Sequence, residues 1–165
     1  MDLFLGKILR VVLILGVGMG FFASAWAGDS PVKGGGNFGI GLELGDPGTW
    51  GAVGKIWLDK VNAFQPAVKL GNGAALLQLD YLWHDYDVIH PKKGWMPLYF
   101  GAGGDLSLQN SVALGARGVV GISYMFNDVQ VPVDIYVQVV PEIWFYSGGV
   151  STFYLYGNVG SRYYF

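Results

Sequence analysis

The chain of 165 residues contains no cysteine and few charged residues. Without cysteine there is no disulfide framework, no thiolate metal site and no cysteine to carry a lipoprotein acyl chain. Only 13% of the residues are charged, whereas soluble domains average about 25%. The formal net charge of −2 provides no basic footprint for nucleic acid. The composition is therefore too apolar for an ordinary water-facing surface and points to a membrane protein.

Long apolar runs are also missing, except at the N-terminus. A membrane-spanning helix needs about 20 mainly apolar residues, and only the N-terminal stretch qualifies. Two basic residues precede an apolar core at 11–22, and the small residues Ala25 and Ala27 follow it. This order is typical of a secretory signal peptide. We predict that residues 1–27 are cleaved rather than kept as an anchor, and that the mature chain begins near Gly28.

The rest of the chain has the period of a β-strand. After a Gly-rich lead-in at 28–36, which we expect to be flexible, apolar residues alternate with polar residues or glycine. Ile135 and Val137, for example, alternate with Tyr136 and Gln138. A period of two indicates strands, and the abundance of glycine, β-branched and aromatic residues disfavours helix.

Turn signals divide this part of the chain at residues 45–48, 72–73, 127–128 and 147–149. The pattern predicts eight strands, at residues 37–44, 52–59, 62–71, 74–84, 96–107, 112–126, 133–146 and 152–165. Strands of about 9–11 residues in even number are typical of bacterial membrane barrels. We therefore predict an all-β fold, a closed antiparallel up-and-down transmembrane β-barrel at 37–165, with both termini in the periplasm.

The inner face of such a barrel is expected to carry charges of both signs. The alternation places five acidic and four basic residues there: Glu43, Lys55, Lys69, Asp80, Asp105, Arg117, Asp134, Glu142 and Arg162. An isolated buried charge is costly, and eight strands enclose a space just wide enough for their own side chains. We predict that these residues form a paired network, with Arg117 and Arg162 as its hubs.

The last strand has a recognisable ending. It closes with Tyr163-Tyr164-Phe165, in which outward apolar residues lie two apart and the final residue is aromatic. This resembles the strand that the outer-membrane assembly machinery recognises, with Tyr163 and Phe165 as the signal. The segments 80–84, 97–101 and 140–142 resemble a family of small bacterial outer-membrane barrels of unknown function, similar in fold to OmpX and to the OmpA membrane domain.

The resemblance implies a location and a set of partners. The location is the bacterial outer membrane, reached by Sec-type export and cleavage of the signal peptide. The partners are outer-membrane lipid, including lipopolysaccharide, and the assembly machinery. Neither nucleic acid nor a cofactor is expected.

Catalytic chemistry has little support in the sequence. The only histidines are His84 and His90, and neither has a serine nucleophile beside it with a carboxylate to orient the ring. Asp80 and His84 lie four apart on one strand face but need further ligands to hold a metal. We therefore expect no catalytic and no metal site. The leading hypothesis is a non-enzymatic structural or surface-interaction protein; a narrow or gated pore for ions or small solutes is the alternative, and a lipid-modifying enzyme the third.

Overall fold

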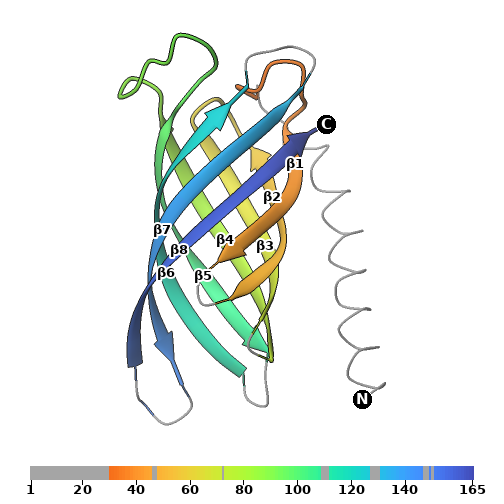
Figure 1. Ribbon diagram of the computed structural model, residues 1–165. Helices are drawn as coiled ribbons and strands as arrows, with labels where there is room; N and C mark the ends of the chain where they lie inside the picture. The colour runs from red at the N-terminus through yellow and green to blue at the C-terminus, as the bar shows by residue number, and fades with distance from the viewer. Residues whose placement is uncertain are drawn as a thin grey trace.

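Eight strands form a closed barrel. The computed structural model describes residues 30–45, 48–71, 73–108, 112–126, 131–146, 149 and 151–165. The strands are β1 (Phe38–Gly45), β2 (Thr49–Trp57), β3 (Asn62–Gly71), β4 (Ala74–Asp85), β5 (Leu98–Leu108), β6 (Val112–Met125), β7 (Val133–Phe145) and β8 (Ser151–Tyr164). Each pairs antiparallel with its neighbours in the chain, and β8 pairs with β1 (Figure 1). The predicted antiparallel up-and-down barrel is confirmed.

Among the described residues, the wall of the barrel consists of strands alone. Within the part of the chain that the structure describes, no helix is long and apolar enough to cross a membrane.

The strand ends agree with the sequence pattern to within two residues, with one exception. The second strand was predicted from residue 52 and begins at Thr49. Gly48 has a φ of 70°, so the turn is complete there and Thr49 already pairs with Gly45. The predicted signal peptide at 1–27 and most of the predicted turn residues (46–47, 72, 127–128 and 147–148) lie outside the described residues.

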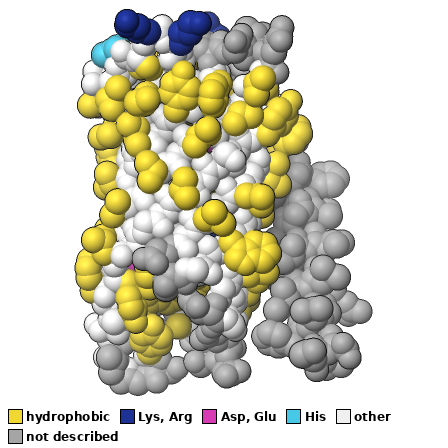
Figure 2. Space-filling model, viewed as in Figure 1, with side chains coloured by type: hydrophobic (Ala, Val, Ile, Leu, Met, Phe, Trp, Pro, Cys, Tyr) yellow, Lys and Arg dark blue, Asp and Glu magenta, His cyan; other side chains and the backbone are white. Residues whose placement is uncertain are grey.

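Apolar side chains cover the outside of the barrel, and most of the charged side chains of the strands point inside. On β7, Ile135 and Val137 are exposed, whereas Asp134, Tyr136 and Gln138 are buried. Figure 2 shows apolar side chains scattered over the whole height of the face in view. Burial is thus reversed relative to a soluble domain, in which the apolar face is the inner one.

Glycine allows the seam between the first and last strands to close tightly. A Cβ built on Gly41 of β1 would lie 1.7 Å from the carbonyl oxygen of Ser161 on β8. No side chain fits at that distance, because the contact is with backbone. Glycine at position 41 is therefore required for β1 to lie this close to β8.

The two ends of the barrel differ in the length of their connections. At the end with both described termini the strands are joined by the segments 58–61, 86–97 and 126–132. The opposite end has the connections 46–48, 72–73, 109–111 and 146–150, none longer than five residues, whereas 86–97 and 126–132 have twelve and seven. Figure 1 shows the long β4–β5 connection at the same end as the C-terminus.

The charged residues on the surface are also distributed unequally between the two ends of the barrel. Four exposed lysines lie at the end with the termini: Lys33, Lys60, Lys92 and Lys93, and Figure 2 shows dark blue side chains only there on the face in view. Asp59 in the β2–β3 connection accepts hydrogen bonds from the Asn62 side chain at 2.8 Å and from the backbone N–H of Val61 at 2.7 Å. These bonds lower the pKa of Asp59 below its ordinary value, the Asn62 side chain having the largest effect.

Candidate functional site

All nine charged residues expected on the inner face are buried. None exposes more than 4% of its surface, as follows: Glu43, Lys55, Lys69, Asp80, Asp105, Arg117, Asp134, Glu142 and Arg162. Alternation along the strands puts them there, because each sits at a position whose side chain points to the barrel axis. The described contacts divide them into three ion-paired clusters and one lysine without a carboxylate.

The first cluster surrounds Arg117 on β6. Its Nη1 lies 2.9 Å from Asp105 on β5, and its Nε lies 3.2 Å from Asp80 on β4 and 3.7 Å from Glu142 on β7. The Trp144 indole N–H donates to Glu142 at 3.0 Å. One guanidinium thus joins carboxylates from three strands, in the half of the barrel away from the termini.

The second cluster surrounds Arg162 on β8. Its Nε and Nη2 donate to the two oxygens of Asp134 at 3.0 and 2.9 Å, which is the bidentate geometry of a strong pair. Its Nη1 donates to the side-chain oxygen of Gln65 at 2.5 Å. The guanidinium lies 4.0 Å from the centroid of the Tyr136 ring, and the Tyr164 hydroxyl donates to Asp134 at 2.8 Å.

The third cluster links β1 to the far side of the barrel. Glu43 forms an ion pair with Lys69 on β3. The Tyr136 hydroxyl donates to Glu43 at 2.5 Å, and the amide of Gln138 lies 3.4 Å from the same oxygen. The Tyr99 hydroxyl donates to Gln138 at 2.9 Å. Neutral polar side chains therefore extend the network beyond the residues that carry charge.

Lys55 departs from the predicted pairing. Among the described residues no carboxylate lies within 4 Å of its amine, and its partner is His84, with Nζ 2.7 Å from Nε2. His84 Nδ1 lies 2.8 Å from the carbonyl oxygen of Val61. Because that oxygen can only accept, the ring proton sits on Nδ1, and Nε2 accepts from Lys55. The rings of Trp57 and Tyr99 lie 4.4 and 5.3 Å from the amine, so aromatic faces replace the expected anion.

We expect Lys55→Met to destabilise the barrel less than the removal of an arginine hub. The change leaves His84 Nε2 as one unsatisfied acceptor, which lowers the free energy of unfolding by about 1–3 kcal/mol. It leaves no carboxylate without a counter-charge. Urea denaturation of the refolded protein measures the difference. A loss for Lys55→Met as large as that for Arg117→Met would show that Lys55 carries charge compensation that the geometry does not reveal.

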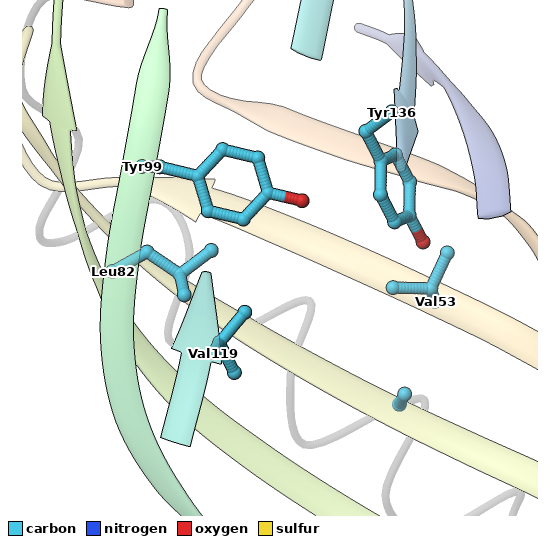
Figure 3. Close-up of a cluster of buried hydrophobic side chains, with 6 residues drawn as sticks. Val53, Leu82, Tyr99, Val119 and Tyr136 are labelled. Atoms are coloured by element: carbon cyan, nitrogen blue, oxygen red, sulfur yellow. The ribbon is translucent and has the colours of Figure 1, made fainter. Parts of the chain in front are cut away.

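An apolar layer separates the Arg117 cluster and Lys69 from Lys55 and the Arg162 cluster, which lie nearer the termini. It consists of Val53, Ala67, Leu82, Tyr99, Val119 and Tyr136. Figure 3 shows these side chains directed inward from different strands. On β4, Leu82 lies between Asp80 and His84, and on β6 Val119 follows Arg117. The layer places buried apolar side chains from six strands inside the lumen.

A second apolar group closes the end with the termini. Val32, from the segment expected to be a flexible lead-in, is only 3% exposed. It packs in one cluster with Trp57 of β2, Met125 of β6 and Tyr164 of β8. The lead-in therefore covers this mouth of the barrel, which the sequence pattern did not predict.

The arrangement offers little for catalysis. Both ring nitrogens of His84 are engaged, one by Lys55 and one by the carbonyl of Val61, so neither is free to activate a hydroxyl. His90 is exposed in the β4–β5 connection. In the described ranges, no group of three histidine or carboxylate side chains is placed to hold a metal ion.

Comparison with known proteins adds no further constraint. None of the protein-family models, curated proteins and solved structures compared with the chain matches it. The functional interpretation therefore depends on the geometry described above.

Proposed function

We propose that this protein is an integral outer-membrane barrel with a structural or surface-interaction role, and neither an enzyme nor an open pore. One observation carries the proposal, namely the reversed burial of its side chains. Leu42 on the outside is 67% exposed, whereas Arg162 on the inside is 1% exposed. Lipid is the environment in which an apolar exterior and a charged, self-paired interior are both favourable.

The outer membrane is proposed as the location because of both chain ends. The rings of Tyr163 and Phe165 are exposed on the outer face with their centroids 5.0 Å apart, as an assembly signal would require. The N-terminal sequence has the order of a signal peptide. We expect N-terminal sequencing of protein from the outer-membrane fraction to begin near Gly28, and an intact Met1 there would contradict export with cleavage.

The filled interior argues against steady conduction. Three ion-paired clusters and the apolar layer occupy the lumen, and an eight-stranded barrel has no further width for a channel. We expect refolded protein in planar bilayers to give no stepwise conductance. Reproducible steps would favour the alternative of a narrow or gated pore. Unchanged lipid A mass spectra in a deletion strain are the matching expectation for a protein that does not modify lipid.

A further inference from the structure

β8 extends well beyond its neighbour β1 at the end opposite the termini. β1 has 8 residues and β8 has 14. Their pairing stops at Gly45 opposite Asn158, whereas β7 pairs with β8 as far as Ser151. In the described part of the chain, residues 151–157 thus have a partner strand on one side only. Figure 1 shows the β7–β8 hairpin reaching past the end of β1.

Two hydrogen bonds at the other end of β8 fix which backbone groups face the open side. The Phe165 N–H donates to Phe38 O at 2.9 Å, toward β1, and the Tyr164 N–H donates to Pro132 O at 2.8 Å, toward β7. The register between β7 and β8 runs without a bulge, so backbone groups keep alternating between the two sides. The groups at the open edge therefore belong to alternate residues: Ser151, Phe153, Leu155 and Gly157.

This edge lacks the features that usually prevent strand pairing. Residues 151–157 contain no charged residue and no proline, the devices that commonly protect a sheet edge. Phe153 and Leu155 are 63% and 61% exposed. In the four turns at this end of the barrel, Asp46 is the only charged residue. An uncharged, apolar edge that is rich in aromatic residues is a template for another strand.

We propose that Ser151–Gly157 is a docking edge for an extended segment of another polypeptide, which adds a strand beside β8. A polypeptide backbone offers N–H and C=O groups at the spacing of this edge. Acyl chains offer neither group, and water satisfies the backbone but leaves Phe153 and Leu155 exposed. The exclusion of acyl chains rests on the proposed membrane location. The segment is expected to be uncharged and to carry apolar side chains beside Phe153 and Leu155.

A second copy of this chain does not fit the edge within one membrane. Antiparallel pairing of identical edges requires a two-fold axis perpendicular to the sheet, which would invert the second barrel. Parallel pairing requires an axis along the strand, and because barrel strands tilt by about 35–45°, the second barrel would be turned by roughly 70–90°. Both arrangements are incompatible with two barrels inserted in the same direction, so two such edges do not pair with each other and the proposed occupant is a segment of a different protein.

The test uses the full chain in cells, with the photo-crosslinking residue p-benzoylphenylalanine replacing Phe153. We expect irradiation to give one discrete adduct with another protein. Leu155→Pro removes an N–H that faces the open edge and no hydrogen bond to β7, so it should lower the adduct yield about tenfold. Leu155→Ala keeps the N–H and should preserve the adduct. As a control, the same crosslinker at Val139, which has partner strands on both sides, should give no protein adduct.

The outcomes are separable from those that test the proposed location. Heat-modifiable gel mobility and membrane fractionation of the same samples report folding and location. If folding and location are both intact, three outcomes would overturn the inference. They are the absence of an adduct, an adduct of twice the chain mass, and an adduct yield that Leu155→Pro does not change. A second measurement needs no variant. Hydrogen exchange at Phe153 and Leu155 should be slower in isolated outer membranes than in purified protein, and equal rates would also overturn it.

Discussion

Replacement of Arg117 by methionine is expected to lower the free energy of unfolding by about 3–5 kcal/mol. Arg117 is the only cation within 4 Å of Asp80, Asp105 and Glu142 among the described ion pairs. Methionine keeps an unbranched apolar stem but lacks the guanidinium, so it leaves three buried carboxylates without a counter-charge. Urea denaturation of protein refolded in detergent measures the loss.

Lys92→Met is the matched control for this prediction. It removes one cation from an exposed connection, where a surface charge contributes little to stability. Equal denaturation midpoints for the two variants would contradict an interior stabilised by ion pairs.

Replacement of Val159 by arginine is expected to cost about 2–4 kcal/mol in a lipid bilayer if the residue lies near the midplane. Val159 is in the central part of β8, is half-exposed on the outer face, and pairs with Leu44 and Val137 on its two sides. In a water-facing barrel the same change would be nearly neutral. The size of the effect therefore reports the solvent outside the barrel.

Val112→Arg separates lipid from a general intolerance of arginine. Val112 is also exposed on the outer face, but it is the first residue of β6, at the rim. Near the interface the cost falls to about 0–1 kcal/mol. Folding in vesicles followed by denaturation should therefore give a larger loss for Val159→Arg than for Val112→Arg. Two small, equal losses would argue against membrane insertion.

The sequence predicted the architecture because the strand pattern is local. Alternation along one strand, such as Ile135 and Val137 against Tyr136 and Gln138, depends only on neighbouring residues. Burial of all nine charged side chains depends on the same alternation. The start of β2 was misplaced because the turn ends at Gly48, and a positive φ at one glycine is not distinguished by composition from glycine within a strand.

The sequence did not predict which side chains contact each other across the barrel, because these contacts depend on the register and stagger of the strands. Lys55 is 29 residues from His84, and their contact follows only once β2, β3 and β4 are aligned. Gln65 and Gln138 occupy inward positions of the same pattern, yet their role in joining Arg162 and Glu43 to other groups is visible only in three dimensions. The open edge of β8 was not predicted for the same reason, since the strand lengths alone do not reveal at which residue of β8 the pairing with β1 stops.

The difference in connection length between the two ends of the barrel determines which parts of the chain are accessible at the cell surface. If the termini lie in the periplasm, as predicted from the sequence, the 12-residue segment 86–97 and the four exposed lysines face the periplasm. Trypsin added to intact cells would then find no lysine or arginine in the turns on the outer side, and an antibody raised against 86–97 would not stain them. A tag for surface display would have to be inserted in one of the connections at 46–48, 72–73, 109–111 or 146–150, because the longest connection is on the periplasmic side.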